Sequence, residues 1–334
     1  MANANGINDL DFIRLRRGAA QLKGAFHNLV KKDRQKAADA LNDERLSFPS
    51  LFLLREEIEA DDLYQALNVK NITAIQVCAK KLNTDFFAAR LDPRPAQDKK
   101  AIINALKWMF ETGAPETLPD TEADAFDAVM DAAAALLILK FGDKSILPKT
   151  AELIFQRNRK GLLIHDLVWS YFQSQDPHAL RLIAEYIPSG SRADVELACS
   201  LLHLPMPEET NGRAARQKLY EDYLRWLNEN GSFLYLTGEH LQFTSNPEPW
   251  KVDLEAKYLC KKISPLSREP IDPVSENEIN WLHRFRRAEK EDQKTLSAYS
   301  QKMHDKDIAA WSQWMQEPSG DHIGAAKANR GGSR

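Results

Sequence analysis

The sequence predicts a mainly α-helical protein in which irregular helical hairpins stack on one another, with one small β-hairpin near residues 233–244. Between segments rich in proline and glycine, apolar residues recur every three or four positions, which is the spacing of an amphipathic helix. Glycine contributes only 14 of the 334 residues, about 4% against a usual value of about 7%, and this scarcity disfavours turn-rich β architectures.

Charge balance and cysteine content restrict the class of protein. Lys and Arg number 45 and Asp and Glu number 48, so the formal net charge of −3 argues against a protein that binds nucleic acid or anionic membranes over its whole surface. No apolar run approaches the roughly 20 residues of a membrane-spanning helix, and the N-terminus lacks the apolar segment of a signal peptide. The three cysteines lie far apart, as is typical of reduced thiols. We therefore expect a cytoplasmic protein without membrane insertion.

The N-terminal helical region is expected to span residues 1–111. Its first helix, residues 9–41, places Leu15 and Leu22 on an apolar face and Arg14 on a basic face. We interpret the basic face as solvated, although a basic amphipathic helix can also lie on a membrane surface or a nucleic acid. Further helices are expected at residues 50–67, 72–82 and 96–110.

The middle of the chain, residues 120–204, is predicted to form a helical-repeat core, because one pattern occurs twice at a separation of 33 residues. The matching pairs are Asp143 and Asp176, Leu147 and Leu180, Ala151 and Ala184, Glu152 and Glu185, and Ile154 and Ile187. An apolar run precedes each copy. Each copy is therefore expected to be a helix, a tight polar turn and a second helix.

Local signals support the second helix of each copy. Asp176 can cap the free N–H groups of its helix, and Pro177 suits the first helical position. Pro148 fits only if its helix begins near Ser145, which places the proline in the first turn. One face of the later helix would carry Leu180, Ile183, Ala184 and Ile187. Because one hairpin cannot bury both of its apolar sides, neighbouring hairpins must stack.

On these residues, the stretch 125–204 resembles the HEAT and armadillo-type repeats, which are families of stacked helical hairpins. The resemblance implies an α-α superhelix that serves as a binding scaffold. Neither flank continues the 33-residue register, so we expect an irregular stack rather than a uniform solenoid.

The C-terminal region, residues 213–316, is predicted to combine helices with the β-hairpin. Leucine, tyrosine and tryptophan residues between 219 and 227 form an aromatic helix face. Two short β runs, residues 233–236 and 240–244, flank a turn that contains Gly238. Further helices are expected at residues 250–263 and 277–315, followed by a disordered tail at residues 317–334.

Known catalytic and metal-binding motifs were not found. The sequence contains no His-x-x-x-His and no Cys-x-x-Cys, the spacings that favour a local zinc site. The segment Gly142 to Ser145 lacks the earlier glycine of a phosphate-binding loop, and no serine occurs in Gly-x-Ser-x-Gly. We therefore predict no catalytic residues, no metal site and no cofactor. An active site assembled from distant residues has no local motif of this kind.

Two basic clusters and a set of tryptophans are the candidate binding residues. Cations at the end of a helix satisfy free carbonyl groups, and Arg beside aromatic rings can also hold phosphates and stack on bases. Tryptophans mostly fill cores, but an exposed pair could dock a partner. The candidates are Arg157, Arg159, Lys160, Trp281, Arg284, Arg286, Arg287, Trp311 and Trp314.

The repeat and the missing catalytic motifs lead to one main hypothesis of function. The chain is expected to be a non-enzymatic scaffold or adaptor that binds another protein, or a second copy of itself, through a repeat-built surface within a larger complex. Two alternatives remain open. The first is a helical-repeat protein that binds nucleic acid through its basic clusters, and the second is an enzyme with a dispersed site.

Overall fold

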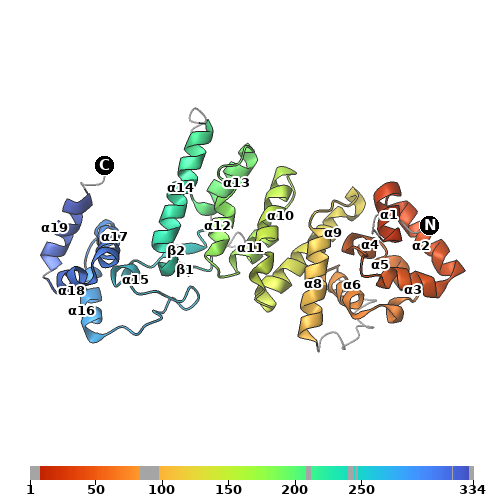
Figure 1. Cartoon of the computed structure of the whole chain (residues 1–334), viewed down its shortest axis with the longest axis horizontal. Helices are drawn as coiled ribbons and strands as arrows, with labels where there is room; N and C mark the ends of the chain where they lie inside the picture. Colours follow the sequence, from red (N-terminus) through yellow and green to blue (C-terminus); the bar gives the residue numbers. More distant parts are fainter. Residues whose placement is uncertain are drawn as a thin grey trace. The chain divides into compact units, whose positions relative to one another are not determined.

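The computed structural model describes residues 8–82, 98–207, 212–239, 244, 247–317 and 319–330. Within these ranges the chain forms 18 α-helices and one two-stranded antiparallel sheet, which confirms the predicted mainly α fold with a small β-hairpin (Figure 1). The helices pack against one another, as a helical-repeat architecture requires. No helix in the described part of the chain is long and apolar enough to cross a membrane.

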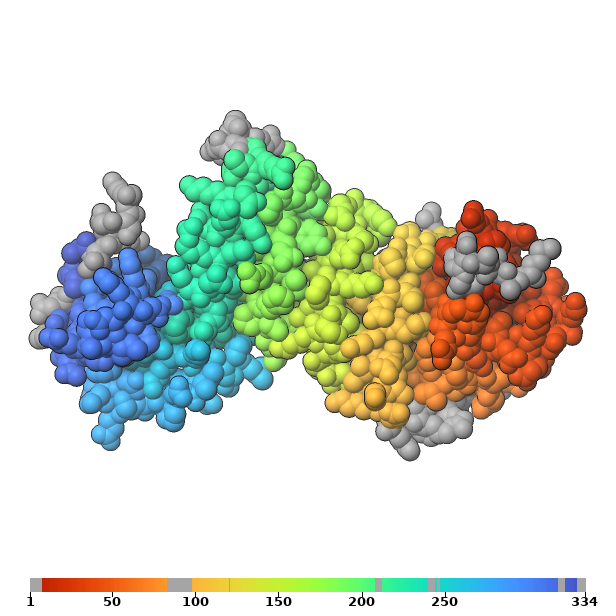
Figure 2. All heavy atoms as spheres, in the orientation of Figure 1, coloured from red at the N-terminus to blue at the C-terminus, as the bar shows by residue number. Residues whose placement is uncertain are grey.

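The chain divides into two compact units, unit 1 (Met1–Ser174) and unit 2 (Gln175–Arg334). In Figure 2 the atoms of unit 1 run from red to light green and those of unit 2 from green to blue. The predicted repeat core at residues 120–204 therefore contributes to both units.

Unit 1 is built from ten described helices and short 3-10 and π turns. The helices are α1 (Asp9–Arg17), α2 (Ala19–Lys32), α3 (Arg34–Asn42), α4 (Phe48–Leu53), α5 (Arg55–Ala60), α6 (Val69–Leu82), α8 (Lys99–Gly113), α9 (Asp120–Ala135), α10 (Leu147–Arg159) and α11 (His165–Phe172). Its core includes the rings of Phe48 and Phe52 from α4, which pack on Phe126 of α9 with centroids 5.6 and 5.1 Å away. These contacts bury aromatic surface between α4 and α9.

The single helix expected at residues 9–41 is wrong, because the chain bends twice there. Gly18 has φ +85°, a conformation that favours glycine, and it separates α1 from α2. The carboxylate of Asp33 accepts a hydrogen bond from the backbone of Lys36 and begins α3. The bend also changes which face of α1 is buried: Leu15 is exposed, whereas Arg14 is buried.

The two copies of the 33-residue pattern share their capping and their buried positions. Oδ1 of Asp143 accepts from the backbone N–H of Ser145 at 3.0 Å, and Oδ1 of Asp176 accepts from His178 at 2.9 Å. The equivalent buried positions are Leu147, Thr150, Ala151 and Ile154 in the first copy and Leu180, Ile183, Ala184 and Ile187 in the second. As predicted, Pro148 lies in the first turn of its helix. The helices differ in length, since α10 has 13 residues and α12 (His178–Ala184) has seven.

Unit 2 combines helices with the two-stranded sheet. Its elements are α12, α13 (Arg192–Leu202), α14 (Gly212–Asn230), β1 (Leu234–Leu236), β2 (Trp250–Val252), α15 (Leu254–Tyr258), α16 (Glu276–Phe285), α17 (Lys290–Lys306), α18 (Ile308–Gln316) and α19 (Ser319–Arg330). In the sheet, Leu236 pairs with Trp250 and Leu234 with Val252. The predicted first run is thus a strand, but its partner is β2, at the point where a helix was expected to begin. The expected second run lies outside the described residues except for Thr244.

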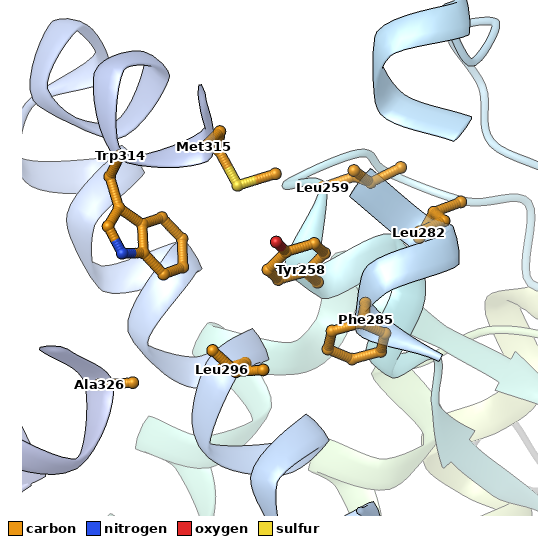
Figure 3. Packing of buried hydrophobic residues seen from close by; sticks show 8 residues of the cluster. All are labelled: Tyr258, Leu259, Leu282, Phe285, Leu296, Trp314, Met315 and Ala326. Carbon is orange, nitrogen blue, oxygen red and sulfur yellow. The ribbon is translucent and has the colours of Figure 1, made fainter. Parts of the chain in front are cut away.

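Figure 3 shows the aromatic core of unit 2, in which Tyr258 of α15 lies at the centre of the labelled side chains. Its ring stacks on Phe285 of α16 at 4.5 Å and meets Trp314 of α18 edge-on at 6.2 Å. Met315 and Leu296 complete the packing. Three separate helices are therefore held together by one buried tyrosine.

The tail at residues 317–334 was expected to be disordered, and the structure corrects this expectation for α19. Ala326 is only 2% exposed and joins the core of unit 2, and Ile323, one turn earlier, packs against the same cluster. A spacing of three residues places both side chains on one helix face. Residues 331–334 lie outside the described ranges.

Candidate functional site

The first predicted basic cluster is divided between the interior and the surface of unit 1. Arg157 is only 3% exposed, and its guanidinium lies 2.6 Å from Oδ1 of Asp131 and 3.1 Å from Oδ1 of Asp127, both on α9. Burial raises the pKa of Asp131 to about 6, although the nearby arginine opposes this shift. The expectation that Arg157 belongs to an exposed binding surface is therefore corrected, because its charge joins α10 to α9.

Arg159 and Lys160 remain at the surface of unit 1, at the end of α10. Nζ of Lys160 donates to Oγ1 of Thr117 at 2.9 Å. A binding role for Arg159 and Lys160 stays a prediction, and Arg157 does not contribute to that surface because it is buried.

In the second predicted cluster, on and after α16, two of the three arginines form hydrogen bonds within unit 2. The guanidinium of Arg286 donates to both carboxylate oxygens of Glu255, at 2.8 and 2.7 Å. Arg284 donates to the backbone carbonyl of Glu317 at 3.2 Å, and Arg287 is exposed. Two of these three arginines thus tie α16 to neighbouring parts of unit 2.

The predicted tryptophans are mainly core residues. Trp314 is 4% exposed, and Trp311 is half-buried and donates through Nε1 to Oγ of Ser300 at 2.8 Å. Trp281 meets Trp311 edge-on, with centroids 6.3 Å apart. The expectation of an exposed Trp311/Trp314 docking pair is corrected, because the indole of Trp314 fills the core around Tyr258.

A cleft of about 910 Å³ in unit 2 is a candidate site. It lies between α14, α15 and α17, and the sheet and the end of α13 close it. One face of α14 contributes Tyr223 and Trp226, whose rings stack at 5.4 Å, and one face of α17 contributes Lys290 and Lys294. None of the nine residues predicted as binding residues lines this cleft.

Lysines dominate the charge of the cleft. The charged lining residues are Lys251, Lys257, Lys290, Lys294, Glu229 and Glu248. Lys251 forms ion pairs with Glu239 at 3.0 Å and with Glu248 at 3.1 Å. The lining thus holds four lysines and two glutamates, and Lys294 pairs with Glu291, which lies outside the lining, at 2.8 Å.

Lys257 differs from the other lysines of the cleft because it is buried, at 7% exposure. Its Nζ donates to Oδ1 of Asn230, the last residue of α14, at 2.6 Å. Burial lowers the pKa of Lys257, although the charge of Glu229 partly offsets this effect. The cleft therefore holds a buried amine whose hydrogen-bond partner is an uncharged amide.

The sequence contains one signal for Lys257. The helix expected at residues 250–263 carries the apolar residues Leu254 and Tyr258, and position 257 lies on the same face as position 254. A lysine on the apolar face of a short helix is a candidate for a buried functional amine. The other walls come from elements far apart in the sequence, and no local pattern places them together.

The lining of the cleft combines aromatic rings with lysine side chains. In the ranges that the structure covers, His, Cys, Asp and Glu side chains form no group of three or more that could hold a metal ion. The walls offer aromatic surface and amine donors. Such a lining fits a ligand with apolar groups and hydrogen-bond acceptors.

The chain was also compared with known proteins. No protein family, no curated protein and no solved structure matches it.

Proposed function

We propose that this protein is a non-enzymatic helical scaffold that holds a short segment of a partner protein in the cleft of unit 2. The observation that carries the proposal is the aromatic cleft of about 910 Å³ between α14, α15 and α17. Ligand pockets commonly measure about 300–1,000 Å³, and grooves between helices accept apolar peptide segments.

The cleft has walls suited to anchoring such a segment. Tyr223 is buried beneath Trp226, and the two stacked rings present an aromatic surface from one helix. Aromatic side chains supply much of the binding energy at protein interfaces. Hydrogen bonds between Lys257 and Asn230 and between Thr237 and Pro249 hold the surrounding elements in place, which limits the entropy lost on binding.

The charged side chains of the cleft indicate which kind of peptide segment it binds. The lysines of the cleft outnumber its glutamates, and Lys290 and Lys294 lie exposed along α17. Opposite charges increase the rate and the specificity of association. The occupant that we propose is therefore an apolar segment that also carries Asp or Glu.

We further propose that the middle of the chain is a divergent repeat of the HEAT or armadillo type. The support is the shared capping by Asp143 and Asp176 together with the matched buried positions that follow each aspartate. The unequal lengths of α10 and α12 favour an irregular array.

A reducing compartment, the cytoplasm, is part of the proposal. Cys78, Cys199 and Cys260 are free thiols, and Cys78 and Cys199 are buried. Burial raises the pKa of Cys78 to about 12, which keeps it as the unreactive thiol. Free cysteines are typical of proteins in reducing compartments.

A peptide selection on the full chain tests the function. Random 12-residue peptides displayed on phage are selected against the wild-type chain, and the affinities of enriched peptides are measured by fluorescence anisotropy. Ala298 is exposed on α17 in the wall of the cleft, so Ala298→Trp should fill the cleft and weaken binding at least tenfold. Ala310→Trp, at an exposed position of α18, is the matched control. Failure to enrich any peptide, or equal affinities for the two variants, would contradict the proposal.

A further inference from the structure

Two buried donors in the wall of the cleft are incompletely satisfied. A lysine ammonium carries three N–H donors, and in the described part of the chain Nζ of Lys257 is hydrogen-bonded only to Oδ1 of Asn230. No carboxylate of the described residues forms an ion pair with this ammonium within 4.0 Å. The indole Nε1 of Trp250 is also buried and has no hydrogen-bond partner there.

This arrangement is unusual for a folded interior. Buried charges are normally paired, and buried donors are normally hydrogen-bonded, because leaving either unsatisfied costs free energy. The amide oxygen of Asn230 is neutral, and Asn230 also donates through Nδ2 to the carbonyl of Trp226 at 2.7 Å, which fixes the orientation of the amide. Asn230 therefore orients the amine of Lys257 without neutralising its charge.

From these observations we infer that Lys257 is the site that binds a carboxylate of the ligand. The ligand supplies the direct ion-pair partner that Lys257 lacks among the described residues. The inference rests on the proposed function and names the chemistry of the occupant: an Asp or Glu side chain of the bound segment reaches Lys257, while its apolar groups contact Tyr223 and Trp226.

The remaining charges around the cleft agree with this assignment. Lys251 forms ion pairs with Glu239 and Glu248. Arg268 forms an ion pair with Asp253, the residue just before α15. Glu229 opposes the entry of an anion, but the lysines of the cleft outnumber the glutamates. Lys257 is thus the buried cation of the lining that retains donors for a ligand.

The test is a double-mutant cycle between the protein and the peptides selected on the full chain. Each enriched peptide is compared with its Asp→Asn or Glu→Gln variant on the wild-type chain and on Lys257→Met. Removing one partner of a buried charge pair is expected to weaken binding at least tenfold on the wild type, and the same peptide change should have less than a twofold effect on Lys257→Met. Lys302→Met, an exposed lysine of α17 outside the cleft lining, is the control for loss of one charge.

One further variant protects the test against a folding defect. Lys257→Gln keeps a hydrogen-bond donor but no charge. We expect it to weaken acidic peptides and to leave purely apolar cleft binders within twofold of the wild type.

The outcomes separate this inference from the proposed function. If enriched peptides bind in the cleft but share no acidic position, or if their acid-to-amide change has the same effect on Lys257→Met, the inference is overturned while the scaffold proposal stands. If no peptide is enriched, or if Ala298→Trp does not weaken the binding, both are overturned. A shared acidic position whose effect disappears on Lys257→Met supports both.

Discussion

Nζ of Lys257 on α15 lies 2.6 Å from Oδ1 of Asn230, the residue that ends α14, and this hydrogen bond joins two walls of the cleft. This hydrogen bond has two consequences. It holds the end of α14 against α15, and it leaves a buried positive charge opposite a neutral group. Functional sites commonly contain groups that lower the stability of the folded chain.

The lowered pKa of Lys257 predicts a dependence of stability on pH. The unfolded chain keeps the proton of this amine up to about pH 10.5, whereas the folded chain releases it at a lower pH. The free energy of unfolding of the wild type should therefore rise relative to Lys257→Met as the pH increases between these two values. Urea unfolding between pH 7 and pH 10.5 measures the difference, with Lys302→Met as the control for charge. A difference that stays constant or falls would disprove the assignment of a destabilised buried ammonium.

The buried ion pairs of Arg157 predict a large structural effect of its removal. Arg157→Met leaves Asp131 and Asp127 without their cation, which should lower the free energy of unfolding by about 3 kcal/mol. Since burial raises the pKa of Asp131, and loss of the arginine raises it further, the loss should increase as the pH rises above about 6. Chemical denaturation at pH 5 and pH 8 compares the two conditions.

Arg159→Met is the matched control for Arg157. Its side chain lies at the surface two residues away, so the change should alter stability by no more than about 0.5 kcal/mol. Similar effects of the two substitutions would contradict a structural role that is specific to the buried arginine.

Two glycines of the N-terminal segment predict opposite effects of the same substitution. Gly18 has φ +85° and ψ 174°, a conformation that only glycine adopts readily, so Gly18→Ala should cost about 1–3 kcal/mol. Gly24 lies inside α2 with open space around its Cα, so Gly24→Ala should stabilise by about 0.5–1 kcal/mol. Thermal unfolding of both variants checks the signs, and stabilisation by Gly18→Ala would mean that α1 and α2 are one helix.

Helix α19 should detach when a charge is placed on its buried face. Ala326→Asp puts a carboxylate at a position of 2% exposure, and the cost of burying it should favour release of the helix from the core. Hydrogen exchange in residues 319–330 should become faster, while exchange in unit 1 is unchanged. Ala328→Asp, at an exposed position of the same helix, is the control. Equal protection in both variants would contradict the docking of α19.

The elements that could be predicted are those whose signal is local. The periodicity of apolar residues located most helices, and the aspartates at positions 143 and 176 indicated two turns that the structure caps in the same way. The same periodicity runs through Gly18 and Asp33, where the apolar spacing continues but the backbone changes direction, so one long helix was expected in place of α1, α2 and α3. The buried side of α1 is then set by packing in unit 1, which its own periodicity does not reveal.

Features that depend on distant packing could not be predicted. β1 pairs with β2, at the start of a segment that was expected to be helical, because strand pairing is decided by residues that meet only in the folded chain. Helix α19 has a weak apolar face and is stabilised by the core around Tyr258 and Trp314. Arg157 belongs to a basic run in the sequence, but the carboxylates that form ion pairs with it lie on α9. The cleft was missed for the same reason, since its walls come from separate elements.

Hydrogen exchange of the full chain with and without a selected peptide tests the central claim most directly. If a segment binds in the cleft of unit 2, its presence should slow exchange in the stretches 223–230, 250–257 and 290–298, and exchange in unit 1 should not change. The effect should disappear in Ala298→Trp and persist in Ala310→Trp. Protection confined to unit 1, or protection of these stretches that survives Ala298→Trp, would contradict the assignment of the cleft as the binding site.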